Sequence, residues 1–265
     1  MSAIEFPEEL VDLDPVSAHP NLLVFSMPRV GKTTWACSDD KIMLINAEVH
    51  GEVSAARSAI TGKNVKQWRV YKYEDFVKAK EWLKELVRQD KTIPFNWVVV
   101  DTLTTLQDRQ LMRYVLDKML VKKPERNKFI PDKPEYLETQ LTLVQDVKEL
   151  CDLPVNVVFL CHEMQPEDAD GNPFSYPQIQ GAGYKVAQQV LAMTTSYGRM
   201  TKELRKKDGK TVVREGKPIV DRVIQWEDKT GVLGERTRNA TLRQIRERMA
   251  QENAKYQAAQ QQPEG

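Results

Sequence analysis

Short apolar runs alternate along this chain with longer stretches in which apolar residues recur every three or four positions. The short runs, rich in Val, Ile, Leu and Phe, have the length of strands buried on both faces. They cover 21–25, 41–45, 67–71, 96–100 and 155–160. The longer stretches predict amphipathic helices over 74–90 and 135–151. Strands that alternate with helices predict an α/β fold built on a mostly parallel, twisted sheet flanked by helices.

The two ends of the sequence differ in character from its middle. Residues 1–20 form an acidic, proline-interrupted leader without Lys or Arg. Apolar stretches at 191–197 and 220–226 predict later strands, as antiparallel additions at one sheet edge, and a helix is expected over 240–257 before a frayed tail. We therefore expect a leader (1–20), one main domain (21–234), and a C-terminal helix with a disordered tail (235–265).

Composition narrows the class of protein. The 265 residues are 41% hydrophobic and 29% charged, which is enough to build a core and stay in solution. No apolar run approaches the roughly 20 residues that span a bilayer, and the start resembles no secretory signal. The three cysteines lack CxxC spacing, which argues against a thiolate zinc site. We expect a cytoplasmic protein without a membrane partner.

The most informative segment, SMPRVGKTT, follows the first predicted strand directly. It matches the phosphate-binding loop GxxxxGK[ST], except that Ser26 stands in place of the first glycine. In such a loop backbone N–H groups and the start of the next helix face the phosphates, and Lys32 reaches the β- and γ-phosphates. The residues expected to bind ATP are Ser26, Met27, Pro28, Arg29, Val30, Gly31, Lys32, Thr33 and Thr34.

A magnesium site is expected beside this loop. The Thr33 hydroxyl can ligate Mg²⁺, and WVVVD supplies a strand that ends in a carboxylate, Asp101. An aspartate at a strand end also serves as a turn or helix cap, so this second motif is weaker than the loop.

Two further polar groups follow neighbouring predicted strands. Glu48 comes after the strand over 41–45, and His162 after the strand over 155–160. If these strands are parallel, both side chains meet near the γ-phosphate, where Glu48 could orient the attacking water and His162 could sense the phosphate. The alternatives are an exposed strand-end glutamate and a histidine with ordinary polar partners. A metal site built from His50, His162 and Glu163 has no supporting ligand spacing.

Together these segments resemble the RecA-like branch of P-loop ATPases. INAE is similar to the family's catalytic-glutamate segment, VVVDTLTTL to its Walker B strand and following helix, and VVFLCHE to its sensor strand. The leader and YPQIQG resemble, more narrowly, phage-encoded AAA/RecA-type nucleotide-binding proteins, including the Sak group of single-strand annealing recombinases. The resemblance covers roughly 21–234 and implies a RecA-like core; a phage origin would place the protein in the host cytoplasm.

The resemblance also implies contacts with DNA and with a second subunit. The segment 164–189 matches mobile loops that contact single-stranded DNA, in which Phe174, Tyr176 and Tyr184 could stack on bases and Lys185 could meet phosphate. Lys229, with Arg236 or Arg238 beyond it, matches the segment that reaches a neighbouring subunit's nucleotide. The alternatives are aromatic side chains packed on their own domain and a solvated hairpin.

The distribution of charge is more informative than its total. The chain carries 39 Lys and Arg against 38 Asp and Glu, a net charge of +1. Three segments are nevertheless basic: 118–128 (five basic, one acidic), 199–217 (eight basic, three acidic) and 236–248 (five basic, one acidic). A near-neutral total therefore leaves room for one basic nucleic-acid track.

These observations predict an Mg-ATP-dependent ATPase that binds single-stranded DNA and promotes annealing or recombination. Lys32, Glu48, His162 and Lys229 are the expected catalytic residues, with Thr33 and Asp101 at the metal. A filament or ring of identical subunits is expected, and a single-strand-binding protein is an open partner. Two alternatives remain: the motor domain of a replicative helicase, and a nucleotide-regulated DNA-binding scaffold or loader with little turnover, which the Ser26 substitution leaves open.

Overall fold

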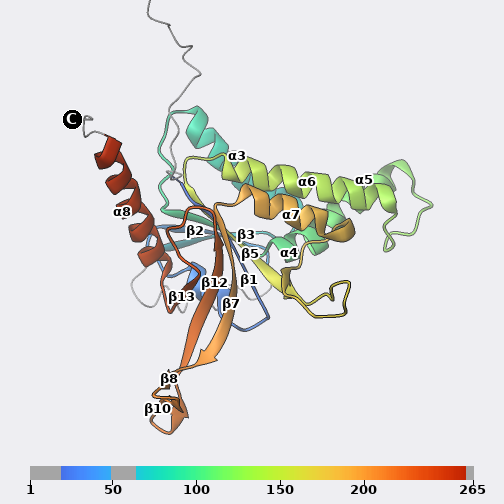
Figure 1. The fold of residues 1–265 in the computed structure, drawn as a ribbon. Coiled ribbons are helices and arrows are strands. Elements are labelled where there is room, and N and C mark those ends of the chain that lie inside the picture. The colour runs from blue at the N-terminus through green and yellow to red at the C-terminus, as the bar shows by residue number, and fades with distance from the viewer. Residues whose placement is uncertain (1–18, 49–63, 261–265) are drawn as a thin grey trace, which may run out of the picture.

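The computed structural model describes residues 19–48 and 64–260, and a nine-stranded sheet runs through this part of the chain (Figure 1). Six neighbouring strands are parallel, whereas the two that continue the sheet beyond β7 are antiparallel. In spatial order the strands are β13 (Arg236–Arg238), β12 (Val220–Asp228), β7 (Ser196–Leu204), β1 (Asn21–Ser26), β5 (Asn156–Met164), β4 (Trp97–Asp101), β2 (Ile42–Asn46) and β3 (Val65–Arg69), with β6 (Tyr176–Pro177) paired to β5. The predicted mixed α/β fold with a mostly parallel sheet is confirmed.

Helices cover both faces of the sheet. One face carries α1 (Lys32–Ala36) and α8 (Leu242–Gln260), which contribute Trp35, Leu242 and Ile245 to its core. The opposite face is covered by α3 (Tyr73–Arg88), α4 (Leu103–Thr105), the π-helix η1 (Leu106–Leu111), α5 (Met112–Lys122), α6 (Lys133–Cys151), the 3₁₀ turn η2 (Ala182–Tyr184) and α7 (Lys185–Met193).

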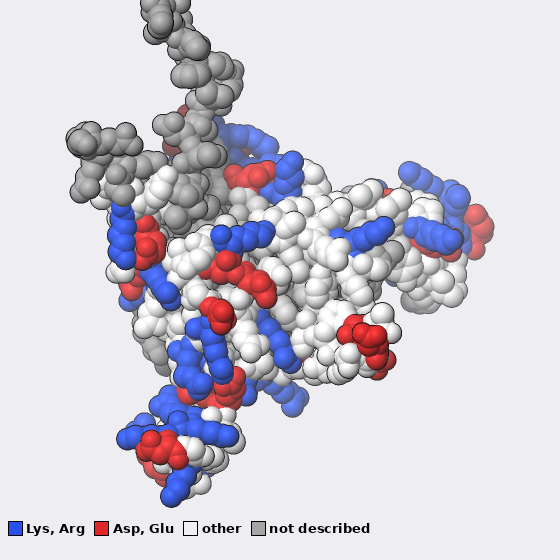
Figure 2. Space-filling model, in the orientation of Figure 1, with Lys and Arg blue, Asp and Glu red and all other residues white. Residues whose placement is uncertain are grey.

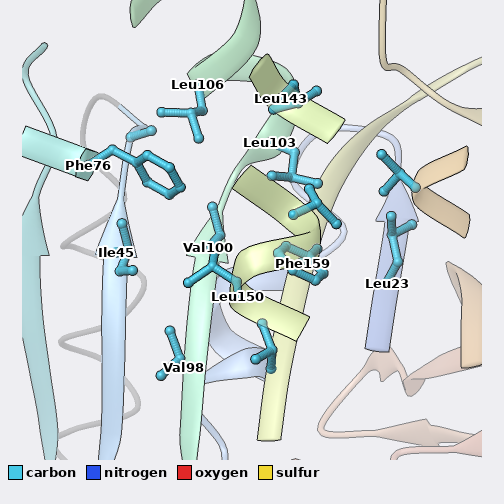
Figure 3. Packing of buried hydrophobic residues seen from close by; sticks show 14 of the residues in the cluster. Leu23, Ile45, Phe76, Val98, Val100, Leu103, Leu106, Leu143, Leu150 and Phe159 are labelled. Carbon is cyan, nitrogen blue, oxygen red and sulfur yellow. The ribbon is translucent and has the colours of Figure 1, made fainter. Parts of the chain in front are cut away.

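The two cores follow from the alternation of side chains along each strand. In β1, Leu23 and Phe25 enter one core, whereas Leu22 and Val24 enter the other. Figure 3 shows part of the larger core, to which strand residues such as Val100 and Phe159 and helix residues such as Phe76 and Leu143 contribute. Because both faces are buried, the central strands are almost continuously apolar, which is why they could be recognised in the sequence.

Two strand predictions need correction. The strand predicted over 67–71 is β3 at Val65–Arg69, and it is only partly buried because β3 is an edge strand with β2 as its neighbour. The segment 191–197 is not one strand: Leu191 and Met193 end α7, and β7 begins at Ser196. The buried residues of α7, Val186, Ala187, Val190 and Leu191, have helical spacing that joins the first residues of the segment to the helix.

The apolar face predicted for α6 is buried only in part. Leu143, Val147 and Leu150 lie in the core, whereas Leu137 and Leu141 are 55% and 61% exposed. In its first half the helix buries Glu135 and Thr139 instead, and Thr139 contacts Met112 of α5. The first half of α6 therefore packs on α5, with Leu137 and Leu141 left on the outside.

Between β7 and β12 the chain forms two short antiparallel hairpins, here called the β-arm (residues 205–219). They are β8 (Lys206–Lys207) with β9 (Lys210–Thr211), and β10 (Val213–Arg214) with β11 (Lys217–Pro218). The β-arm projects away from the body of the molecule (Figure 1), and its short strands are exposed. The KKDGK segment (206–210) thus forms the turn of the first hairpin.

The predicted C-terminal helix is present as α8, and its start is bonded to the chain just after α1. The Trp35 indole donates to the Ala240 carbonyl (3.0 Å), and the Leu242 amide donates to Ser38 Oγ (2.7 Å). Arg246 of α8 reaches the fully buried Asp39 carboxylate (2.6 Å). Because α8 runs to Gln260, the tail begins later than predicted.

Some expectations fall outside the described residues. The leader, apart from its last two residues, and the final five residues of the tail are in this group, as is His50. Across residues 19–48 and 64–260, no helix has both the length and the apolar character needed to cross a membrane.

Candidate nucleotide-binding site

Apart from Lys229, the predicted site residues lie at the carboxyl edge of four parallel strands, β1, β5, β4 and β2. In the sheet register Ser26 is opposite His162, and Asp101 is opposite Asn46 and Leu160. β5 therefore separates the strand that leads into the loop from the strand that ends in Asp101. The segments that leave these strand ends meet at one edge, where open α/β sheets bind ligands.

The loop over 26–34 has Ser26 at the position where the motif has its first glycine, and the structure has room for this side chain. Ser26 is the last residue of β1 and is completely buried, so a side chain at this position is compatible with strand backbone. Its carbonyl and hydroxyl oxygens accept hydrogen bonds from Lys32 Nζ at 3.0 and 3.2 Å. Gly31, by contrast, has φ +109°, a conformation that favours glycine. Ser26 therefore adds a partner for Lys32 where glycine would offer only its backbone.

Lys32 carries its positive charge into a buried position. Lys32 is the first residue of α1. Burial lowers the pKa of its ammonium group, whereas the negative charge of Asp101 raises it. An ammonium group whose partners are neutral oxygens is well suited to bind a phosphate anion.

The remaining loop residues differ in exposure. Met27, Pro28 and Arg29 are exposed, whereas Val30 packs against the core on the α1 face and Thr34 lies within α1. Two cations from the β7–β12 pair also reach this loop. Lys202 Nζ donates to the Arg29 carbonyl at 2.7 Å, and Arg222 Nε is 2.8 Å from the position that a Cβ on Gly31 would take. Local sequence patterns gave no signal for either contact.

Thr33 and Asp101 form the contact expected of a magnesium site. The Thr33 hydroxyl donates a 2.5 Å hydrogen bond to Asp101 Oδ2. Burial raises the pKa of Asp101 to about 6, although the Thr33 hydrogen bond and the Lys32 charge oppose this rise. A hydroxyl and a carboxylate oxygen held together fit the ligand preference of Mg²⁺, so Thr33 and Asp101 are the residues that would hold the ion. A bound Mg²⁺ would neutralise charge on the nucleotide's phosphates.

Glu48 is held in place at the end of β2 by three side chains. Its Oε1 accepts hydrogen bonds from Thr102 (2.8 Å) and Thr105 (2.6 Å), and it lies 2.9 Å from His162 Nε2. Burial opposes ionisation, yet the bonds from His162, Thr105 and Thr102 lower the pKa of Glu48 to about 2. Glu48 is therefore ionised at neutral pH, and its other oxygen has no hydrogen bond from the described residues.

His162 and the two threonines belong to the same arrangement. The Thr104 hydroxyl accepts from the His162 amide (3.0 Å) and donates to the Gln178 carbonyl (2.7 Å), which fixes the end of β5. Thr102 also caps α4 by accepting from the Thr105 amide. Nothing in the sequence indicated that Thr102 and Thr105 hold Glu48.

Lys229, Arg236 and Arg238 have other partners in this chain. Lys229 Nζ donates to the carbonyls of Leu191, Ala192 and Thr194, at the C-terminal end of α7. Arg236 is paired with Glu203, and Arg238 with Asp221 and Glu203. Their predicted contact with a neighbouring subunit's nucleotide stays a prediction.

The aromatic residues of the 164–189 loop form a cluster of their own. The rings of Phe174, Tyr176 and Tyr184 contact one another edge to face, with centroids 5.4 to 6.1 Å apart. Lys185 is exposed at the start of α7. The rings are only partly buried, and their predicted stacking on DNA bases stays a prediction.

Comparisons with known proteins agree with this arrangement at the level of the family. A family model described as an AAA domain matches residues 18–235, most of the chain. A search of curated proteins finds no match. The matched region contains the loop, Glu48, Asp101 and His162, and the chain belongs to the AAA domain family, as an AAA/P-loop ATPase-type domain.

Proposed function

We propose that this protein is a RecA-like ATPase that uses Mg-ATP to bind single-stranded DNA and promotes annealing or recombination, as phage recombinases of the Sak type do. One observation carries the ATPase part of the proposal. The Thr33–Asp101 hydrogen bond and the Glu48–His162 contact lie at the same sheet edge as the phosphate loop.

The roles of the side chains follow from their charge and partners. Lys32 is the phosphate cation, and Thr33 and Asp101 are the metal-binding pair. Glu48, with a pKa of about 2, is too weak a base to remove a proton efficiently at neutral pH, so its role is to orient the attacking water. His162 lies within β5 and touches Glu48, so it can link occupation of the γ-phosphate site to that strand.

The DNA-binding part is supported by exposed basic charge. Lys and Arg side chains gather on the β-arm at the bottom of Figure 2, where Lys206, Lys207 and Lys210 are exposed. Among the described residues these three lysines have no carboxylate within ion-pair distance. Unpaired basic side chains on a projecting hairpin are suited to the phosphates of a nucleic acid.

A homo-oligomer, as a filament or ring, is supported by exposed apolar side chains. Val121, Phe129 and Ile130 are 61–84% exposed around the α5–α6 connection, and Leu137 and Leu141 are exposed one turn apart on α6. Exposed apolar groups of this size are typical of surfaces that another protein covers. A second copy is the occupant we propose, and a single-strand-binding protein is a further proposed partner.

The decisive experiment measures ATP turnover with and without single-stranded DNA, followed by annealing of complementary strands. We expect DNA to stimulate turnover and annealing to require Mg-ATP. Turnover that DNA does not change would contradict the recombinase and favour the scaffold or loader. Strand displacement on a forked duplex, without annealing, would instead favour the helicase motor.

A further inference from the structure

The β7–β12 pair extends beyond the strand that leads into the phosphate loop. β1 pairs with β7 from Leu22 to Phe25, opposite Ser196 to Arg199, whereas β7 continues to Leu204. Lys202 and Arg222 are directly opposite each other in this extension. The two cations therefore lie on a two-stranded ribbon next to the loop rather than within the sheet.

The alternation of side chains places both cations on the face that carries α1. Met200 and Ile224 form the next pair along the ribbon on that face, and both belong to the core that contains Trp35 of α1. Lys202 and Arg222 continue this row past the end of β1. Both cations are exposed. Along this face the side chains thus change from the apolar pair to the cationic pair beside the start of the loop.

Both side chains reach the loop backbone. Lys202 Nζ donates to the Arg29 carbonyl at 2.7 Å. Three guanidinium atoms of Arg222 lie 2.8 to 3.4 Å from the position of a Cβ on Gly31, so this side chain occupies the space beside the glycine. The positive φ of Gly31 favours glycine, and the absence of a Cβ leaves room for the guanidinium beside it.

Arg222 differs from the other arginines of this region in its partners. Arg205, Arg236 and Arg238 each pair with Asp221 or Glu203. The Arg222 guanidinium has no hydrogen bond or ion pair with any of the described residues, although it lies next to a loop of phosphate-binding type. A guanidinium offers five donors in a planar fork that matches phosphate oxygens.

We propose that Lys202 and Arg222 form a same-chain cation pair for the bound nucleotide: Arg222 contacts the phosphates of a nucleoside di- or triphosphate, and Lys202 is a positioning residue that holds the loop at Arg29. The inference rests on the proposed nucleotide binding. It differs from the predicted contact of Lys229, which would come from a neighbouring subunit.

Titration of the full-length protein with Mg-ATP and Mg-ADP, followed by calorimetry, tests the proposal. Arg222→Gln is expected to weaken both nucleotides about tenfold, the size of effect that a lost charge-assisted hydrogen bond gives. Arg222→Lys should recover part of the lost affinity, because lysine restores the positive charge but not the planar set of guanidinium donors. Lys202→Met also weakens binding, whereas Lys202→Arg, which can still donate to the Arg29 carbonyl, binds as the wild type does.

Two controls separate this inference from the proposed function. Arg88→Gln removes the same charge from the exposed end of α3 and should leave both affinities unchanged. Lys32→Ala should abolish binding. If Lys32→Ala abolishes binding but Arg222→Gln binds within twofold of wild type, the cation pair is wrong and the nucleotide site stands. If Lys32→Ala binds normally, the nucleotide site itself is wrong.

Discussion

Glu48 Oε1 and His162 Nε2 are 2.9 Å apart although 114 residues separate them in the chain. The contact connects the ends of β2 and β5, which lie on either side of β4 in the sheet. Thr102 and Thr105, which follow β4, donate to the same carboxylate oxygen. The segments that leave three adjacent strands thus position one acidic group beside the phosphate loop.

Glu48→Gln is expected to separate nucleotide binding from hydrolysis. The amide oxygen can still accept from Thr102 and Thr105, so the site should keep its shape, but the negative charge that orients water is lost. We expect kcat to fall by roughly 10²-fold, because the attacking water is no longer positioned, with KM nearly unchanged. Steady-state phosphate release measures both constants. Glu85→Gln, an exposed residue of α3, is the matched control, and a Glu48→Gln enzyme within tenfold of wild-type kcat would rule out the proposed role.

Lys32→Ala tests the loop itself. The buried ammonium donates to the Ser26 carbonyl, and the Lys32→Ala change removes the cation expected to meet the β- and γ-phosphates. Binding of a fluorescent ATP analogue should be lost while the circular dichroism spectrum stays the same. Lys66→Ala, which removes an exposed lysine from β3, should bind normally. Unchanged turnover in Lys32→Ala would refute the phosphate-loop assignment.

We expect the exposed lysines of the β-arm to give the protein a salt-dependent affinity for single-stranded DNA. Replacing Lys206, Lys207 and Lys210 together by Ala should weaken binding and reduce the slope of log affinity against log salt by about 2, because each phosphate contact on a single strand contributes about 0.7. Fluorescence anisotropy with a labelled oligonucleotide at several salt concentrations gives both quantities.

A matched triple variant removes the same charge from another surface. Lys78, Arg88 and Lys91 are exposed on α3 and the turn that follows it. Changing these three residues to Ala should leave the slope as in the wild type. If both triple variants lower the DNA affinity and the salt slope equally, binding depends on net charge alone. If neither variant changes them, the β-arm is not part of the binding surface.

The carboxyl group of Asp108, in η1, is expected to make the free energy of unfolding depend on pH. Burial raises its pKa from 3.8 to about 6, and its Oδ1 is buried without a hydrogen-bond partner among the described residues. The folded state therefore holds this proton more tightly than the unfolded state, so its contribution to stability is complete below pH 4 and is lost as pH rises through 6. Asp108→Asn should be more stable than wild type at pH 7.

Urea unfolding at pH 4 and pH 7 measures this difference. The advantage of Asp108→Asn should be present at pH 7 and nearly absent at pH 4. Asp117→Asn, on the exposed surface of α5, serves as the control and should show no such trend. An Asp108→Asn advantage of the same size at both pH values would contradict a raised pKa.

The sequence predicted the elements whose pattern depends on local burial. β1, β4 and the loop between β1 and α1 were recognisable because strands covered on both faces are apolar throughout and the loop has a fixed motif. The positions of Glu48 and Asp101 followed from their places at strand ends, whereas His162 lies inside β5, which continues to Met164 beyond the end predicted at residue 160. The strand order, by which β5 inserts between β1 and β4, was not accessible, because it depends on long-range pairing.

Other features depend on contacts that no local pattern records. The exposure of Leu137 and Leu141 follows from the packing of α6 on α5, and the periodicity of a helix cannot tell which neighbour covers it. Lys202 lies in the basic segment 199–217, and Arg222 lies in the stretch 220–226 that predicted a strand, so neither pattern indicated a contact with the phosphate loop. Their contact with the loop arises from the length of β7 and β12, which the apolar pattern did not define.

The attachment of α8 to the residues just after α1 gives the molecule a mechanical property. Its 19 residues correspond to a rigid rod about 28 Å long, bonded at its base to Trp35, Ser38 and Asp39. A rotation of only about 5° at that base would carry the far tip through about 2.5 Å, as the length of the rod dictates. Small adjustments of the helix that follows the phosphate loop are thereby magnified at a distant surface.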